Sequence, residues 1–389
     1  RMARARKAGP AVPGSAAAQA QAKWQQLCAR ADDAAATPKG LIVVSDLRVA
    51  PLLQSTWDQE TAAGVGLAAC YNYYTPPYGP GRTTNYPSGC VATAMAQFLR
   101  YYQYPDTGVG TASFTISVRG VPQAYSLRGG NGSGGPYMWS DMPLAPPATP
   151  TTAQCQAIGA LVADAGATVN TDYAANGSAA SVLDVKGALL GTFKFSHAAQ
   201  GWKNNKNIGE SLTRMINPNL DARGPVLLGI DGPNGGHAVV VDGYGYHLAT
   251  LYHHLNLGWS GGANAWYALP FIDAAVYTFT TITKCIYNAY TNGTGEIISG
   301  RVLDQRARPV ANATVSAVRT GGGTYTATTY TNGIYALARI PASSTYTLTV
   351  SKADFSSAVS NFTTGVSVNL TATCGNYWGA NFTLNQLPT

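Results

Sequence analysis

The pattern of the sequence changes at Thr291-Asn292-Gly293-Thr294-Gly295, and this change constrains the architecture more than any other feature. Before this point, stretches with the spacing of amphipathic helices, such as residues 153–167, alternate with short apolar runs. After it, helical spacing disappears, and short runs rich in Val, Thr and Tyr alternate with turns. The sequence therefore predicts an α+β domain with a helical part and an antiparallel β part over residues 46–290. An all-β sandwich is expected over residues 296–386.

Six strand-like runs are predicted within the second part, where the dipeptide Asn332-Gly333 is a hairpin signal. They are residues 297–303, 313–318, 324–330, 333–338, 346–352 and 366–372.

Residues 1–45 differ from both parts, because they are rich in Ala, Gln and Pro. We expect them to be an N-terminal tail or the remnant of a pro-segment. Much of the formal net charge of +7 lies here, since four of the first seven residues are Arg or Lys. The rest of the chain contains no stripe of Lys and Arg interleaved with aromatic residues, which argues against a nucleic-acid partner.

The composition also bears on the compartment. Only 11% of the 389 residues are charged, whereas the chain contains 43 Gly, 22 Pro and 23 Tyr. This composition favours a secreted protein rich in loops and strands over a cytosolic helical one. No apolar stretch reaches the roughly 20 residues that a membrane-spanning helix needs. We therefore expect an extracellular protein without a membrane span.

Cys90 is the strongest candidate for a catalytic residue. It follows a Pro-Ser-Gly break and opens an apolar run with helical spacing, so its thiol is expected in the first turn of a helix, where the dipole favours thiolate. His237 lies 147 residues downstream, after two glycines at the start of an apolar strand. Papain-like enzymes separate nucleophile and histidine by about 130–150 residues. Taken singly, the two residues fit a buried cysteine and a core histidine; together with their flanking motifs they predict a cysteine-nucleophile hydrolase.

Two further polar residues could complete such a site. Asn256, 19 residues after His237, could accept a hydrogen bond from the imidazole and orient it, with Trp259 shielding that bond. Gln59, 31 residues before Cys90, could supply a side-chain amide that forms an oxyanion hole with the Cys90 N–H group. By position alone, Asn256 also fits a turn residue and Gln59 an ordinary polar loop residue.

Metal and nucleotide chemistry are poorly supported. The five histidines do not show the His-Glu-x-x-His spacing of a zinc protease, and the adjacent His253 and His254 would face opposite sides of a strand. No phosphate-binding glycine loop occurs. We therefore expect no metal and no cofactor.

Four segments of the chain, taken in order, resemble the streptopain family of secreted bacterial papain-like cysteine peptidases. They are residues 52–59, 89–97, 236–244 and 254–259. The resemblance implies a papain-like fold and a secreted endopeptidase made as a zymogen. It also implies Cys90 as nucleophile, His237 as base and then acid, Asn256 as the orienting residue and Gln59 as an oxyanion donor. The family usually has Trp at the position of Leu257 and Gly at that of Ser260, so the packing behind His237 is expected to differ.

The resemblance extends to substrate and to the C-terminal part. Family members accept hydrophobic residues at the second subsite, and we expect Ser178, Gly235, Gly236 and Trp259 to lie near that pocket. The C-terminal part resembles a carboxypeptidase regulatory-like, transthyretin-like module, which could contact a surface or a polysaccharide. Two alternatives stay open: a non-catalytic extracellular binding or adhesion protein on a peptidase scaffold, and an acyl transferase on the same fold.

Overall fold

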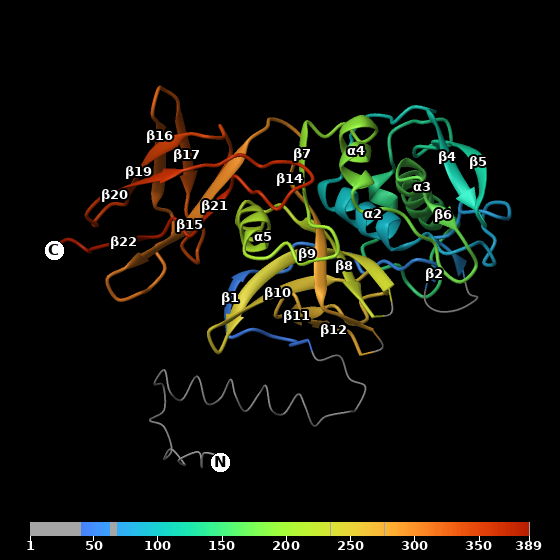
Figure 1. Ribbon diagram of the computed structural model, residues 1–389, viewed down its shortest axis with the longest axis horizontal. Coiled ribbons are helices and arrows are strands. Elements are labelled where there is room, and N and C mark those ends of the chain that lie inside the picture. The colour runs from blue at the N-terminus through green and yellow to red at the C-terminus, as the bar shows by residue number, and fades with distance from the viewer. Residues whose placement is uncertain (1–39, 63–67, 234, 276, 389) are drawn as a thin grey trace, which may run out of the picture.

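The structure is a computed structural model that describes residues 40–62, 68–233, 235–275 and 277–388. It shows two unequal parts side by side, an α+β part and a smaller all-β part (Figure 1). Residues 1–39 of the expected N-terminal tail lie outside the described residues.

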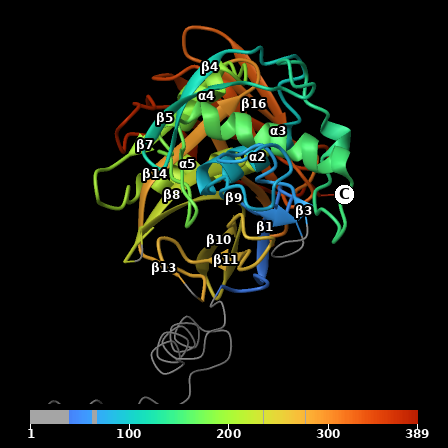
Figure 2. The ribbon, with the colours of Figure 1, turned by 90° about the vertical axis from the view of Figure 1, so that its right-hand side faces the viewer.

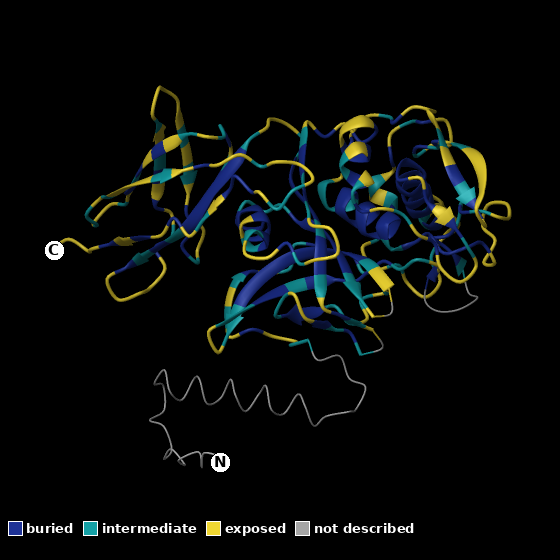
Figure 3. Ribbon diagram, viewed as in Figure 1, coloured by how far each residue is buried: buried dark blue, intermediate teal, exposed yellow. Residues whose placement is uncertain are grey.

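A seven-stranded antiparallel sheet forms the centre of the α+β part. Its strands run in the order β11-β10-β9-β8-β14-β7, and β1 pairs with β9. Their bounds are β1 Asp46–Val49, β7 His197–Trp202, β8 Val226–Gly232, β9 Gly235–His247, β10 Thr250–Asn256, β11 Ala265–Tyr267 and β14 Thr281–Tyr290. Figure 3 shows that β9 is buried along most of its length.

Helices cover both faces of this sheet. On one face, α2 (Cys90–Tyr102) packs with α3 (Thr152–Thr168) and α4 (Asp184–Gly191), as Figures 1 and 2 show. On the other face lies α5 (Ser211–Asp221). The residues of β9 follow this division, because Ala238 and Val240 belong to the α2 core and Val239 and Val241 to the α5 core. This is the alternation expected of a strand buried on both sides.

Smaller elements surround the two cores. The strands are β2 Thr61–Ala62, β3 Ala68–Ala69, β4 Ser113–Val118, β5 Val121–Ser126, β6 Asp172–Tyr173, β12 Ile272–Asp273 and β13 Thr278–Phe279, and a 3-10 helix spans Trp139–Asp141. The helix predicted over residues 153–167 is α3, which begins at a capping box formed by Thr151 and Gln154. Among the described residues, no helix is long and apolar enough to cross a membrane.

The C-terminal part is built from two four-stranded sheets. One contains β18-β15-β21, with β22 also pairing with β15, and the other runs β17-β16-β19-β20. The bounds are β15 Glu296–Asp304, β16 Thr314–Arg319, β17 Thr324–Thr328, β18 Ile334–Ile340, β19 Thr345–Ser351, β20 Ala358–Thr363, β21 Tyr377–Trp378 and β22 Phe382–Leu384. Apolar side chains such as Val302, Tyr335 and Leu348 fill the space between the sheets.

The first five predicted strands of this part overlap β15 to β19, but the sixth is wrong. Residues 366–372 lie outside any strand, and the strand in that region is β20. Their alternating apolar residues do not line a core, since Val366, Val368 and Leu370 are 46%, 43% and 51% exposed. The segment instead runs across to the other part of the molecule, where the Leu370 N–H group donates to the carbonyl of Gln200 on β7.

Buried polar contacts join the two parts. Asp221, at the end of α5, accepts hydrogen bonds from Tyr244 on β9 and from Ser299 on β15, at 2.8 and 2.7 Å. Apolar contacts also cross the junction, because Ile334 and Cys374 belong to the same core as α5. The all-β part is thus packed firmly against the α5 side of the sheet.

Candidate active site

Cys90 is the first residue of α2, as the sequence predicts. The preceding Gly89 has a φ of +87°, and a Cβ atom there would lie 2.8 Å from the carbonyl oxygen of Ser178. Glycine is therefore required for the close approach of the two segments. The Ser178 hydroxyl donates to the carbonyl of Pro87 at 2.5 Å, so the segment around Ser178 is tied to the turn that presents the thiol.

His237 lies near the start of β9, where it pairs with Ile230 of β8. Its Nε2 atom is 2.8 Å from the carbonyl oxygen of Leu257, so Nε2 carries the proton and donates it to that bond. The ring lies near Trp259 and Phe279, at centroid distances of 4.7 and 5.8 Å. The carbonyl fixes the tautomer, which leaves Nδ1 as the basic nitrogen.

Cys90 and His237 line the same cleft, which has a volume of about 310 Å³. The other lining residues are Val91, Ser178, Ala179, Ala180, Ser181, Val182, Gly229, Ile230, Asp231, Gly236, Ala238 and Lys284. Most of these side chains are small, and a charged pair also lines the cleft, where Lys284 Nζ is 3.9 Å from Asp231 Oδ2. The arrangement places a thiol and an imidazole together where a peptide chain could lie.

Desolvation decides the charge state of the pair. Burial raises the pKa of the Cys90 thiol, although the backbone N–H groups of Ala238, Val91 and Cys90 itself favour the thiolate. Burial also lowers the pKa of His237 to about 4, against the hydrogen bond to Leu257, which raises it. The helix dipole was expected to favour thiolate, but the loss of solvent outweighs it. At neutral pH the pair therefore rests as thiol and neutral imidazole.

Asn256 lies close to the site, but the imidazole of His237 donates its hydrogen bond to the Leu257 carbonyl and not, as predicted, to the side-chain oxygen of Asn256. The Asn256 amide is 3% exposed and bonds elsewhere. Its Oδ1 accepts from Gln97 Nε2 at 3.0 Å and from the Gly258 N–H group at 3.1 Å, and its Nδ2 donates to the Ser55 carbonyl at 2.7 Å. The side chain thus points to α2, and the next residue's backbone reaches the imidazole.

Gln59 is anchored beside the nucleophile through its backbone. Its carbonyl accepts hydrogen bonds from the Ser88 N–H group at 2.8 Å and the Ser88 hydroxyl at 3.1 Å, two residues before Cys90. Its own N–H group donates to Asp58 at 2.7 Å. Its half-buried side-chain amide makes no hydrogen bond to the described residues, so both amide N–H groups are available.

The predicted pocket residues divide into two groups. Ser178 and Gly236 line the cleft. Gly235 is exposed at the start of β9, and Trp259 packs on the histidine ring outside the set of lining residues. Sequence reasoning missed Asp231 and Lys284, because nothing in their own segments distinguishes them from other strand residues.

The departures from the family pattern behind His237 have a structural explanation. Leu257 is 1% exposed, and its side chain belongs to the core on the α5 side of the sheet. Its carbonyl, which any residue would supply, contacts the imidazole. Ser260 has a φ of +52°, a conformation that favours glycine, and its hydroxyl donates to Asp58 Oδ2 at 2.6 Å.

Over residues 40–62, 68–233, 235–275 and 277–388, no group of three or more His, Cys, Asp or Glu side chains is arranged so that it could hold a metal ion.

Comparison with known proteins points to cysteine peptidases. Residues 66–267, just over half of the chain, match the peptidase C10 family, and residues 297–375 match the carboxypeptidase regulatory-like domain. Streptopain of Streptococcus pyogenes is 27% identical over 194 residues, which are 48% of this chain and 46% of streptopain. The thiol protease/hemagglutinin PrtT of Porphyromonas gingivalis is 30% identical over 187 residues, 48% of this chain and 21% of PrtT. The chain thus spans less than half the length of these relatives.

A solved structure supports the same assignment. The active wild-type interpain A cysteine protease of Prevotella intermedia superposes with a TM-score of 0.50 and 27% identity, covering 61% of this chain and 93% of interpain A. This likeness confirms the predicted papain-like α+β fold, and the regulatory-like domain match agrees with the all-β C-terminal part.

Proposed function

Because the chain belongs to the peptidase C10 family, we propose that it is a cysteine endopeptidase that cleaves peptide bonds through a thioester acyl-enzyme. One observation carries this proposal: Cys90, at the start of α2, and His237, held by the Leu257 carbonyl, line one cleft. The alternative function, a non-catalytic binding protein on a peptidase scaffold, does not require a cysteine and a histidine that line the same cleft.

The chemistry follows from the tautomer of His237. Since Nε2 donates to Leu257, Nδ1 accepts the Cys90 proton as the sulfur attacks the substrate carbonyl. The tetrahedral oxyanion is stabilised by the Cys90 N–H group at the helix N-terminus and by the free amide of Gln59. The imidazolium then protonates the leaving amine, and water hydrolyses the thioester after giving a proton to His237.

Asn256 acts in this mechanism as a positioning residue. Its side chain fixes the end of β10 against Gln97 of α2, and the carbonyl of the following Leu257 orients the imidazole. The helix that carries the nucleophile and the strand end that holds the base are therefore connected by one pair of amides.

The lining of the cleft supports our proposal that the enzyme prefers a hydrophobic residue at the second subsite. Ala179, Ala180, Val182 and Ile230 provide an apolar wall, with Ser178 and Gly236 beside the catalytic pair. We infer that the enzyme is secreted and acts on extracellular proteins or peptides, as expected from the low charge content.

We further propose a domain organisation. Residues 1–45 would be a tail or pro-segment remnant, residues 46–290 the peptidase domain and residues 296–386 the regulatory-like domain. The last would contact a surface or polysaccharide, and activation from a zymogen would precede activity.

Casein hydrolysis tests the proposal. The wild-type protein should release peptides, whereas Cys90→Ala and His237→Ala should each lose nearly all activity while unfolding at similar temperatures. Cys155→Ala removes a buried thiol outside the cleft and should keep activity. Folded wild-type protein that cleaves nothing would favour the binding protein, and transfer of the acyl group to an added amine in place of water would favour the acyl transferase.

A further inference from the structure

Three paired residues on neighbouring strands form a row along the sheet side of the catalytic cleft. Ala238 of β9 pairs with Gly229 of β8, which in turn pairs with Lys284 of β14, and all three line the cleft. The backbone N–H group of Ala238 faces the Cys90 sulfur. Because neighbouring strands lie about 4.8 Å apart, the backbone of Lys284 is roughly 10 Å from that of Ala238. The row thus leads from the nucleophile to a lysine.

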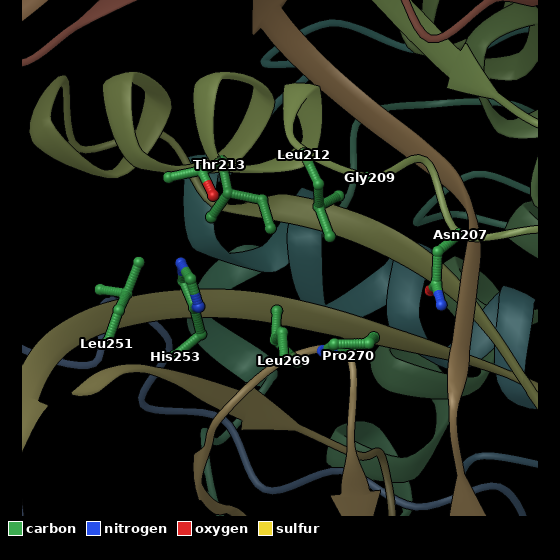
Figure 4. A pocket seen from close by; sticks show the side chains of 9 residues that line it. Asn207, Gly209, Leu212, Thr213, Leu251, His253, Leu269 and Pro270 are labelled. Carbon is green, nitrogen blue, oxygen red and sulfur yellow. The ribbon is translucent and has the colours of Figure 1, made fainter. Parts of the chain in front are cut away.

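A β-bulge turns Lys284 toward the cleft. The register of β14 against β8 shifts between Ile282 and Lys284, so Thr283 is an extra residue there. Ile282 belongs to the core on the α5 side, and in a regular strand the side chain two positions later would follow it into that core. Asn207, which lies on the α5 side (Figure 4), holds the bulge, because its Oδ1 atom accepts the Ile282 N–H group at 2.7 Å and its Nδ2 atom donates to the Thr280 carbonyl at 3.3 Å. The lysine is therefore presented to the cleft by the fold.

Gly229 gives the lysine side chain room to lie across the sheet. A Cβ atom at Gly229 would lie 3.0 Å from Lys284 Cβ and 3.1 Å from Lys284 Cδ. The aliphatic stem thus occupies the space that a side chain on β8 would fill, one strand nearer to Cys90 than the lysine backbone. The Lys284 side chain is still 27% exposed, so a bound substrate can reach it.

The ammonium group of Lys284 has donors to spare. Its Nζ atom donates to Thr283 Oγ1 at 3.2 Å, whereas Asp231 Oδ2 is 3.9 Å away, too far for a hydrogen bond. That carboxylate oxygen already accepts the Thr283 hydroxyl at 2.6 Å. Within the described residues, two of the three N–H donors of Lys284 therefore have no protein acceptor. Lys284 is also the only Lys or Arg among the described residues that line the cleft.

We propose that Lys284 is a specificity-determining residue that lets the second subsite accept glutamate as well as apolar residues, an inference that rests on the proposed peptidase function. The apolar wall of Ala179, Ala180 and Val182 would contact the two methylene groups of the glutamate side chain. Its carboxylate would accept the free N–H donors of Lys284, as charge-assisted hydrogen bonds. Asp231 offsets part of this attraction, because its negative charge lies beside the same ammonium group.

Peptide cleavage tests the proposal. Three peptides are built on one bond that the wild-type protein cuts in casein, and they differ only in having Glu, Gln or Leu two residues before that bond. Gln has the shape of Glu without its charge, so the ratio of kcat/KM for Glu over Gln isolates the ionic contribution. We expect a ratio of about five for a partly exposed ion pair. The ratio should fall as salt is added. Mass spectrometry of the products checks that all three peptides are cut at the same bond.

Three variants locate the effect. Lys284→Met keeps an unbranched stem without the charge, so the ratio should fall to about one or below, since Asp231 then repels glutamate. Asp231→Asn should raise the ratio. Lys203→Met is the control, because Lys203 is exposed outside the cleft lining while its N–H group pairs with the Thr283 carbonyl, and it should leave the ratio unchanged.

Two kinds of failure can be told apart. If the Leu peptide is cut but Glu and Gln are cut equally well, or if the ratio survives in folded Lys284→Met, the inference about Lys284 is wrong and the peptidase function stands. If folded wild-type protein cleaves neither casein nor any peptide, the proposed function is wrong, and this inference falls with it.

Discussion

At the scale of single residues, the reactivity of the site depends on how the surroundings shield His237. Trp259 and Phe279 pack near its ring and the Leu257 carbonyl occupies one nitrogen. Burial favours the neutral imidazole, against the hydrogen bond to the Leu257 carbonyl, which favours the charged ring; burial also favours the neutral thiol of Cys90. Proton transfer then accompanies the attack on substrate instead of preceding it.

This charge state predicts the pH dependence of catalysis. His237 must be neutral to accept the proton, and its pKa is lowered from the ordinary 6.5 to about 4, so kcat/KM should fall only as the pH drops toward about 4. Trp259→Ala exposes the ring and should move this acid limb upward, toward 6.5. Circular dichroism at each pH separates protonation from unfolding, and a wild-type acid limb near 6.5 would contradict the account.

The Asn256–Gln97 pair predicts a coupled effect. Asn256→Ala leaves the buried Gln97 Nε2 without its acceptor, and Gln97→Ala removes one of the two donors to Asn256 Oδ1, so each variant should cost about 1–3 kcal/mol of the free energy of unfolding. Because the cost is shared, the double variant should lose less than the sum of the two single losses. Chemical denaturation measures all four proteins. Additive losses, with catalysis impaired by Asn256→Ala alone, would instead assign Asn256 a direct contact with His237.

At the scale of elements, the position of α2 determines where the thiol lies. The turn before the helix is held between Gln59, which accepts hydrogen bonds from Ser88, and Ser178, which donates to Pro87. The left-handed Gly89 between them permits both contacts. The helix start is therefore fixed from two sides, by segments far apart in the sequence.

Substitution of Gly89 tests this arrangement. In Gly89→Ala the new methyl group would meet the Ser178 carbonyl at 2.8 Å in a backbone conformation unfavourable for alanine. We expect a loss of about 1–3 kcal/mol in stability and a fall of about 10²-fold in kcat/KM from displacement of the thiol. Gly187→Ala in α4 is the control, because its methyl group meets nothing within 4 Å, and it should gain about 0.5–1 kcal/mol. Wild-type kinetics in Gly89→Ala would show that the turn is not constrained.

Several of these elements could be predicted from sequence, and the limits have physical causes. The helix start at Cys90 and the glycine-flanked strand of His237 are local patterns, so they could be read directly. The role of the Leu257 carbonyl could not be predicted, because every residue carries a carbonyl group and only the folded structure determines which one faces the His237 ring. Residues 366–372 were misread as a strand because alternation alone does not distinguish a core-lining strand from an exposed segment crossing to β7.

At the scale of the whole molecule, the two parts are joined through buried polar groups whose ionisation depends on the junction. Asp221 connects α5, β9 and β15. Burial raises its pKa to about 7, although the hydrogen bonds from Ser299 and Tyr244 favour the charged form. Because the C-terminal part packs against α5, the Asp221 carboxyl group is buried, and its ionisation costs more free energy there than in water.

Because the pKa of Asp221 differs between the folded and the unfolded chain, the stability of the protein depends on pH. The folded pKa of Asp221, about 7, exceeds the ordinary value of 3.8, so its contribution to stability is present below about pH 4 and is lost as the pH rises to about 7. Urea denaturation between pH 4 and 8 should therefore show a smaller decline for Asp221→Asn than for the wild type. In this variant the Ser299 hydroxyl can rotate to accept from the new amide. Identical pH profiles would mean that Asp221 is not forced to ionise in the folded state.

The central claim, that Cys90 and His237 form a working pair in one cleft, is tested most directly by covalent labelling. An epoxysuccinyl inhibitor of cysteine proteases should add once per chain, and peptide mapping by mass spectrometry should place the adduct on Cys90. The buried cysteines at positions 70, 155, 285 and 374 should stay unlabelled. Labelling should be lost in folded His237→Ala, because the thiol is neutral at rest and needs the imidazole to take its proton. Adducts on other cysteines, or equally fast labelling of Cys90 without His237, would contradict the account.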